Sequence, residues 1–291
     1  GCYKKYNLSR YNVLSKKTGV IMGKLKNAMY EIQDLDEMAG LNTAIHQVHP
    51  LVKLILTVIY IGCVVSYGKY NLWGLLPFVI YPLILFYLTG ISVRSCFRKL
   101  KAVLPLVFLI GIFNPLLDRQ PLYKIGGIII TGGFLSMITL ILKGIYALMA
   151  AFLLIATTGI ERICYAMRLL HVPGILVTQI LLTYRYITVL LREADGVYEA
   201  YSLRAPGEKG VRFKVWGSLL GQLLFRSIDR ALNLYDSMLL RGFHGEFYYA
   251  RSQKMSGKDY GFLAIWTGMF VALKLLNIGN LINYFSLLKK I

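Results

Sequence analysis

Long apolar runs separated by short polar breaks dominate this sequence. Five of them have the length of a candidate membrane span: residues 51–67, 72–88, 102–117, 133–158 and 260–276. A helix of roughly 17 to 25 apolar residues crosses the hydrocarbon core of a bilayer. The run at 102–117 is short and contains Pro105 and Pro115, which predicts a kink or an extension into the interface. The pattern therefore predicts an all-α, multi-pass membrane protein with about five transmembrane helices.

A different pattern covers residues 159–259, where apolar positions recur at helical spacing among charged ones. We expect two long amphipathic helices in this region, near 175–203 and 215–241. Pro173 marks the start of the first helix, and Gly242 is the expected cap of the second.

These patterns divide the chain into four parts, which alternate between polar and apolar character. They are a basic cytoplasmic arm (1–45), a four-helix transmembrane region (46–158), a cytoplasmic helical domain (159–259) and a last transmembrane helix with a tail (260–291). Within the second part, residues 118–132 are expected to form a loop on the other side of the membrane.

The composition supports this division, because 56% of the residues are hydrophobic and only 16% are charged. Soluble domains carry about 25% charged residues. No Asp or Glu occurs between Glu37 and Asp118, or between Asp118 and Glu161, as expected of segments that lie in hydrocarbon. The cations behind the net charge of +19 collect in residues 1–50, 89–101 and 159–259. The positive-inside rule places these segments, and the N-terminus, on the cytoplasmic side of a bacterial plasma membrane.

Several function classes lack their sequence signatures. No zinc finger, RRM or helix-turn-helix pattern accompanies the basic residues, so nucleic acid is not the expected partner. No phosphate-binding loop, nucleophile motif or pair of carboxylates indicates an enzyme or a bound cofactor. His46 and His49, spaced i, i+3, are weak candidates for metal ligands, because no Cys, Asp or Glu stands near them. Their more ordinary role is to start the helix that follows at Pro50.

Two similar tripeptides close the two amphipathic helices. They are Leu203-Arg204-Ala205 and Leu240-Arg241-Gly242. A single arginine in the last turn of a helix ordinarily complements the helix dipole. Two such ends in one cytoplasmic domain favour a second role, because a guanidinium at a helix end can bind carboxylates or carbonyls of a soluble partner.

The alternative of a self-sufficient ion-coupled carrier is disfavoured by the spans themselves. Such carriers place ionisable residues or broken helices at the middle of the membrane. The predicted spans contain no Asp or Glu. Lys143 lies within the fourth span, and its charge is expected to snorkel or to face a neighbouring helix. The protein therefore needs energy from a partner.

From about Leu41 to Leu276 the sequence resembles the transmembrane T component of energy-coupling-factor importers, the EcfT/CbiQ family, and most of all its cobalt-type CbiQ branch. The matching pieces are Ile45-His46-Gln47-Val48-His49-Pro50-Leu51-Val52-Lys53, Gly111-Ile112-Phe113-Asn114-Pro115-Leu116, Ile155-Ala156-Thr157-Thr158-Gly159 and the two arginine ends. The family usually has a small residue before each arginine, where this chain has Leu203 and Leu240.

The resemblance implies that the amphipathic helices form a coupling domain. Leu203, Arg204 and Ala205 would dock on one cytoplasmic ABC ATPase subunit, and Leu240, Arg241 and Gly242 on a second. ATP-driven motion of the ATPases would then reorient a separate substrate-binding membrane subunit, similar to CbiM. That partner, and not this chain, would hold the metal.

The resemblance leaves the substrate open. Cobalt uptake is the first expectation, and a nickel or a vitamin importer of the same type is the close alternative. A stand-alone membrane carrier, or a scaffold for another soluble complex, is the alternative from a different class.

Overall fold

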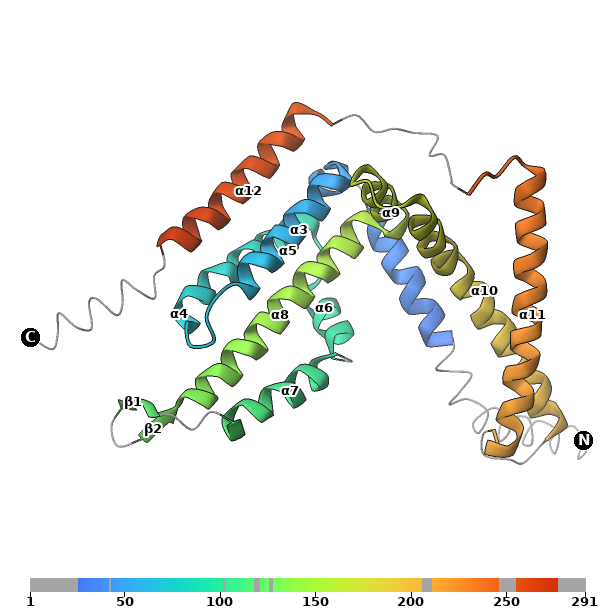
Figure 1. The fold of residues 1–291 in the computed structure, drawn as a ribbon, viewed down its shortest axis with the longest axis horizontal. Coiled ribbons are helices and arrows are strands. Elements are labelled where there is room, and N and C mark those ends of the chain that lie inside the picture. Colours follow the sequence, from blue (N-terminus) through green and yellow to red (C-terminus); the bar gives the residue numbers. More distant parts are fainter. Residues whose placement is uncertain are drawn as a thin grey trace, which may run out of the picture. The chain divides into compact units, whose positions relative to one another are not determined.

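The computed structural model describes residues 26–41, 43–101, 103–117, 121–125, 128–205, 211–245 and 255–276. These residues are helical apart from turns and one short hairpin, so the predicted all-α membrane class is confirmed (Figure 1). The chain divides into two units. We call residues 38–170 and 251–291 the bundle unit, and residues 1–37 and 171–250 the helix-pair unit.

The bundle unit contains all five of the predicted spans. Its helices are α2 (Ala44–Gln47), α3 (Pro50–Val65), α4 (Leu72–Leu75), the 3-10 helix η1 (Leu76–Val79), α5 (Ile80–Thr89), α6 (Val93–Leu100), α7 (Leu104–Leu117), α8 (Gly132–Thr158), α9 (Ile160–Leu169) and α12 (Gly257–Leu276). The long helix α8 packs against α3, α5 and α7. The predicted helix start at Pro50 is confirmed, and Pro suits this position because its missing N–H has no partner in the first turn.

The core of the bundle unit is an aromatic cluster. Tyr60 of α3, Phe78 of η1 and Phe270 of α12 are almost completely buried, and their ring centroids lie 5.4 to 6.2 Å apart. Tyr81 packs edge-on against Phe270 at 5.1 Å. Aromatic pairs in this range add to the gain from burial, so this cluster joins α3, η1, α5 and α12.

The second predicted span is not one regular helix. Leu72–Thr89 forms α4, η1 and α5, with Pro77 in the 3-10 turn. Pro82 has no N–H to donate to the carbonyl four residues earlier, that of Phe78. The Tyr60 hydroxyl donates to this carbonyl instead, at 2.9 Å. The structure thus satisfies the acceptor that proline frees, which makes Pro82 tolerable within an apolar segment.

Helices α7 and α8 approach each other through two glycines. A Cβ added at Gly144 would lie 2.8 Å from Val107 Cγ1, and one at Gly111 would lie 3.4 Å from side chains of Met137 and Ile141. Small residues of this kind let apolar helices pack closely in a membrane. Between the two helices, the predicted loop 118–132 contains an antiparallel hairpin, β1 (Pro121–Ile125) and β2 (Ile128–Thr131). The sequence analysis did not foresee these strands.

Three helical segments among the described residues are long and apolar enough to cross a membrane: Leu72–Thr89, Gly132–Thr158 and Gly174–Arg204. Pro50–Val65 and Leu104–Pro115 are shorter apolar helices. The third long segment is α10, which the sequence analysis assigned to the cytoplasmic domain. Its length and apolar content therefore fit lipid as well as water, as its many leucines suggest.

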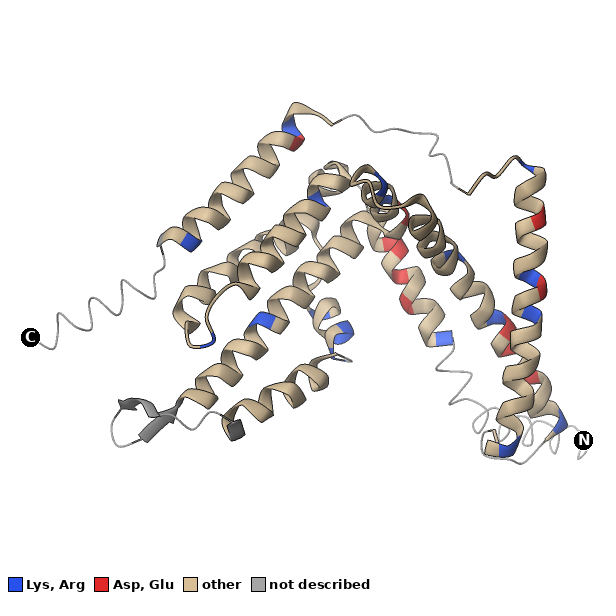
Figure 2. Cartoon of the chain, in the orientation of Figure 1, with Lys and Arg blue, Asp and Glu red and all other residues tan. Residues whose placement is uncertain are grey.

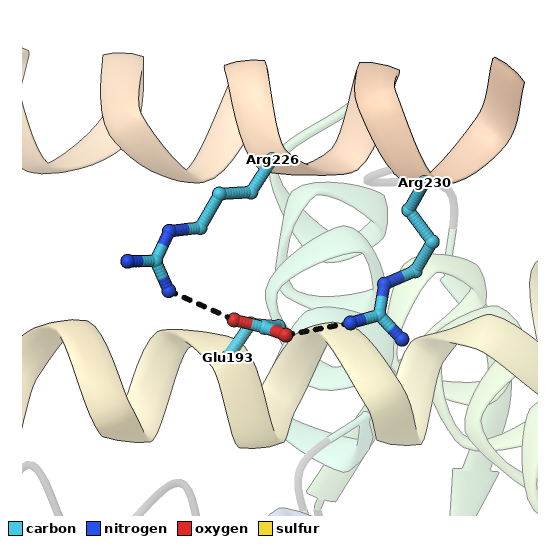
Figure 3. Close-up of polar contacts among 3 residues, drawn as sticks. All are labelled: Glu193, Arg226 and Arg230. Carbon is cyan, nitrogen blue, oxygen red and sulfur yellow. Dashed lines mark hydrogen bonds and ion pairs between the residues drawn. The ribbon is translucent and has the colours of Figure 1, made fainter. Parts of the chain in front are cut away.

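The helix-pair unit consists of α10 (Gly174–Arg204), α11 (Phe213–Leu240) and the first part of a helix at 26–39. Glu193 of α10 accepts from Arg226 at 3.1 Å and from Arg230 at 2.7 Å (Figure 3). The first part of the 26–39 helix contacts α10 through the Tyr184 hydroxyl, which donates to Asp36 Oδ1 at 2.6 Å. The predicted start of α10 after Pro173 is confirmed.

Candidate functional site

The first arginine end is the regular C-terminus of α10. Arg204 is the last helical residue, and Ala205 follows as the C-cap with its N–H donating to the Tyr201 carbonyl at 3.0 Å. Leu203 and Arg204 are both exposed. A positive side chain thus stands where the last carbonyls of α10 carry partial negative charge, with its guanidinium open to solvent.

The second end is built differently. Arg241 is the C-cap of α11, and Gly242 follows with φ +78°. The Gly242 N–H donates to Leu239 O at 2.9 Å and the Phe243 N–H to Met238 O at 3.0 Å. These two bonds make a Schellman motif, which needs a left-handed residue at this point and explains the glycine. The prediction of Gly242 as the cap is confirmed, and Arg241 is exposed beside it.

The two ends lie at opposite ends of the helix pair. Glu193 meets Arg226 and Arg230, while Ile175, at the start of α10, shares a groove with Met238, at the end of α11. Both observations require α10 and α11 to run antiparallel. At 1.5 Å per residue, Arg204 and Arg241 are then separated by roughly 35 Å along the pair. The structure therefore offers two separate contact points and does not gather both arginines into one site.

Large apolar side chains between these ends are exposed. Helix α11 has no buried residue, and Phe213 and Phe225 are among its most exposed side chains. A groove of about 450 Å³ lies between α10 and α11, with Leu182 and Tyr186 on one wall and Leu234 and Met238 on the other. Apolar patches of this extent are typical of surfaces that contact lipid or another protein.

Charge is distributed unevenly over the elements (Figure 2). Both signs of charge follow α10 and α11, whereas α5 and α7 carry none and α8 carries only Lys143. The Lys143 ammonium donates to the Val65 carbonyl at the end of α3 at 3.1 Å. Of the two expectations from the sequence, snorkelling or facing a neighbouring helix, the structure shows the second.

The histidines suggested as weak metal ligands are buried and hydrogen-bonded. His46 Nε2 lies 3.0 Å from the Met38 carbonyl and Nδ1 lies 2.7 Å from the Thr43 hydroxyl, so both ring nitrogens are engaged. His49 is the N-cap of α3, and its Nδ1 accepts from the Leu51 N–H. Both rings therefore organise the start of α3.

The described residues contain no group of three His, Cys, Asp or Glu side chains that could hold a metal ion. Cys63, Cys96 and Cys164 are free thiols. Burial raises the pKa of Cys96 to about 11 and also raises the pKa of Cys164. Both are therefore protonated at neutral pH, a form in which cysteine is a poor metal ligand.

Two buried charges near the start of α3 were not singled out by the sequence analysis. Lys53 and Asp259 are 6% and 8% exposed, and both are hydrogen-bonded. The sequence gives one indication of each: Lys53 interrupts an apolar run, and Asp259 directly precedes another. A buried charge in an otherwise apolar bundle calls for a structural or functional reason.

Comparison with known proteins gives a consistent picture. A family model described as CbiQ, cobalt transport protein, matches residues 42–253, well over half of the chain. The nickel permease LarQ of Lactiplantibacillus plantarum is 27% identical over 104 residues, which cover 36% of this chain and 38% of the permease. An uncharacterized protein of Methanocaldococcus jannaschii is 26% identical over 223 residues, which cover 73% of this chain and 75% of that protein. Both arginine ends lie within the range that the family model matches.

Proposed function

The chain belongs to the CbiQ family of cobalt transport proteins, and we propose that it is the energy-coupling membrane subunit of an ATP-driven metal importer. In this role it carries out no chemistry. It receives force from two cytoplasmic ABC ATPase subunits and passes it to a substrate-binding membrane subunit. The observation that carries the proposal is the antiparallel helix pair with one exposed arginine at each end.

The geometry of the helix pair suits two ATPase subunits. Each guanidinium stands at a helix end with exposed neighbours, where it can donate several charge-assisted hydrogen bonds into a groove of a partner. A separation of roughly 35 Å between Arg204 and Arg241 suits two grooves on two subunits better than one shared site. When ATP binding draws the subunits together, the two ends move with them and the angle between α10 and α11 changes.

The contacts between α10 and α11 allow such a change. The ion pairs of Glu193 with Arg226 and Arg230 are partly exposed, and exposed ion pairs contribute only about 0.2–1 kcal/mol each. Helix α11 also exposes many large apolar side chains. We assign this surface to the membrane and to the substrate-binding subunit, which would cover it in the assembled importer.

The substrate of the proposed importer is a divalent transition-metal ion. The family description names cobalt, and the relative in Lactiplantibacillus plantarum is named a nickel permease. We therefore propose cobalt as the substrate and nickel as the nearest alternative. The metal would be held by the partner membrane subunit.

The docking role is tested by reversing the charge of both arginines. We expect the double variant Arg204→Glu/Arg241→Glu to lose co-elution with the ATPases and to lose uptake, because each buried charge pair that is broken costs about 2–5 kcal/mol of binding. Arg192→Glu is the matched control, since it reverses an exposed charge on α10 three turns before the end. Unchanged co-elution and uptake in the double variant would sink the docking assignment.

A second measurement separates the function classes. Vesicles that contain the whole importer should take up radioactive cobalt only when ATP is supplied, and unlabelled nickel or a vitamin can be added as competitor. Competition by a vitamin alone would contradict the metal assignment. Uptake by this chain without any partner would favour a stand-alone carrier instead.

A further inference from the structure

Helix α6 of the bundle unit, together with the residue that caps it, carries a row of positive charge. Arg94, Arg98 and Lys101 are spaced i, i+4 and i+7, so they share one face of the helix. All three side chains are exposed, whereas Cys96 and Leu100 on another face are buried. Figure 2 shows the blue residues on α6 and none on α7. We call Arg94, Arg98 and Lys101 the cationic row.

The charge of the cationic row is not balanced by the part of the chain that the structure describes. None of the three side chains forms an ion pair or a hydrogen bond with these residues. The sequence has no Asp or Glu between Glu37 and Asp118. Like charges four residues apart on a helix repel each other. An anion from outside the chain that bound the row would relieve this repulsion.

A shallow apolar groove of about 560 Å³ begins at the last residue of the cationic row. Lys101 lines one end of the groove. The other lining side chains are apolar and lie on one face of α7: Leu104, Pro105, Phe108, Leu109, Ile112 and Phe113. The last four of them are about half exposed. The groove therefore has a positive end and an apolar length.

The length of the groove matches one leaflet of a bilayer. Helix α7 rises about 14 Å between Leu104 and Phe113. The hydrocarbon core of a bilayer is about 30 Å thick, so one leaflet contributes about 15 Å. An acyl chain that lies along this face of α7 therefore spans one leaflet, with its head group beside the cationic row.

The chemistry of the row and of the groove favours a phospholipid. A guanidinium donates two parallel hydrogen bonds to phosphate oxygens, and an ammonium binds phosphate as a point charge. Basic clusters next to membrane helices attract anionic head groups at the cytoplasmic surface, where the positive-inside rule predicts residues 89–101. An apolar helix of another protein would cover the groove but leave the row without an anion. A molecule that joins a phosphate to a hydrocarbon chain fits both parts.

We propose that the cationic row and the groove on α7 together bind an anionic phospholipid of the phosphatidylglycerol type. The head-group phosphate contacts Arg94, Arg98 and Lys101. One acyl chain lies along α7, over Phe108 and Leu109. The bound lipid neutralises the row and covers the apolar face. The site requires no ATPase and no substrate-binding subunit, so it goes beyond the proposed coupling function and does not depend on it.

The test uses the full chain reconstituted in phosphatidylcholine vesicles. The vesicles contain a small fraction of phosphatidylglycerol with a photoreactive group on its acyl chain, and mass spectrometry locates the labelled residues after illumination. This lipid should label residues 104–113 at least about 5-fold more than photoreactive phosphatidylcholine does, because each cation near an anionic surface raises the affinity about 5-fold. Added salt should reduce the preference, since it screens exposed charges.

The triple variant Arg94→Gln/Arg98→Gln/Lys101→Gln removes the cationic row. We expect both photoreactive lipids to label residues 104–113 nearly equally in this variant. Exposed positions tolerate such substitutions with little change in stability, and thermal unfolding of the reconstituted chain checks this. The single variant Lys101→Gln changes only the residue at the end of the groove. It should lower the preference by about 5-fold.

The matched control removes three exposed cations from the helix-pair unit: Arg185→Gln/Arg192→Gln/Lys214→Gln. It lowers the net charge of the chain by the same amount as the triple variant and leaves α6 and α7 unchanged. The preference for phosphatidylglycerol at residues 104–113 should therefore stay at the wild-type value. A loss of preference in this control would mean that the total charge of the chain, and not the cationic row, attracts the lipid.

Three further results would contradict the lipid site. Equal labelling by the two lipids in the wild type would show ordinary lipid contact without recognition of the head group. Loss of the labelling when soluble glycerol phosphate is added would show a site for free phosphate. Absence of lipid labelling at residues 104–113, with cross-links to a second copy of the chain, would show that protein covers this face. None of these outcomes bears on ATPase docking, which the arginine variants at the helix ends test separately.

Discussion

In the bundle unit, α3 buries Val52, Leu56 and Tyr60 completely, whereas α11 of the helix-pair unit has no buried residue among its 28 positions. Both helices are rich in apolar side chains. Among the described residues of its own unit, the first helix is packed on several sides, and the second leaves most of its apolar side chains exposed. A helix with a wide exposed apolar surface is typical of a surface that contacts lipid or another protein, and on the proposed function the assembled importer would cover it.

The two units also use charge differently. Lys53 and Asp259 of the bundle unit are buried and bind backbone groups, which ties helices into fixed positions. Glu193, Arg226 and Arg230 of the helix-pair unit are partly exposed and bind one another. Buried charges are costly to separate from their partners, while exposed pairs are weak and screened by salt. The bundle unit thus relies on buried charges bound to backbone groups, and the helix-pair unit on partly exposed ion pairs.

The largest expected effect is on the free energy of unfolding, and it tests the difference in burial between the two units. Phe270→Ala should lower the free energy of unfolding by about 3–5 kcal/mol, because it leaves a cavity in the aromatic cluster. Phe225→Ala on α11 is the matched control, since Phe225 is 71% exposed while Phe270 is fully buried. Thermal unfolding in detergent measures both. Equal losses in the two variants would mean that the helix pair is packed as firmly as the bundle.

A smaller effect is expected at two glycines with similar φ. Gly159→Ala should destabilise the protein by about 1–3 kcal/mol, because only glycine adopts this backbone conformation readily and a Cβ would press on Ala39. Gly242 has a φ of +78°, but a Cβ added there would meet open space. In Gly242→Ala only the left-handed backbone cost of about 1 kcal/mol therefore applies. Denaturant unfolding compares the two, and a larger loss at Gly242 would contradict the difference in packing.

The smallest effect concerns pH. In the folded protein burial lowers the pKa of His46 below its ordinary value of 6.5, so the unfolded chain binds a proton more readily. The stability that neutral His46 supplies is fully present above pH 6.5 and is lost as the pH falls through the folded-state pKa. His46→Gln keeps an N–H donor but does not titrate, so it should reduce the loss of stability between about pH 7.5 and about pH 5.5.

His244→Gln is the control for this prediction, because His244 is exposed in the helix-pair unit. It should leave the pH dependence of unfolding unchanged. Thermal midpoints at the two pH values provide the measurement. A wild-type pH dependence in His46→Gln would show that other groups cause the acid sensitivity.

Much of the fold follows from the sequence alone. Whether a run of residues lies in hydrocarbon depends on its own length and apolar content, so the helices of the bundle unit and the membrane class could be predicted. Helix boundaries also have local causes. Pro50 and Pro173 precede or open helices because of their fixed φ, and Gly242 ends α11 because a Schellman motif needs a left-handed residue. The exposed arginines at both helix ends could therefore be located in advance.

Other features depend on contacts between segments that are distant in sequence. The 3-10 turn at Pro77 and the Tyr60 hydroxyl that serves Phe78 could not be read from one apolar run. The antiparallel order of α10 and α11, which separates Arg204 from Arg241, depends on how two helices pack. The hairpin within 118–132 depends on strand pairing.

The sequence by itself determined that this chain is a helical membrane protein of the transport class, with amphipathic helices that end in arginines. Only the tertiary structure decided that Asp259 caps the helix begun by His49 and that Lys53 binds the end of α8. The physical reason is that whether an apolar run can lie in hydrocarbon depends on its own length and composition. A buried charge, in contrast, is stable only where folding supplies its partner. One hydrogen-bond partner of Lys53, and one of Asp259, comes from a residue more than a hundred positions away.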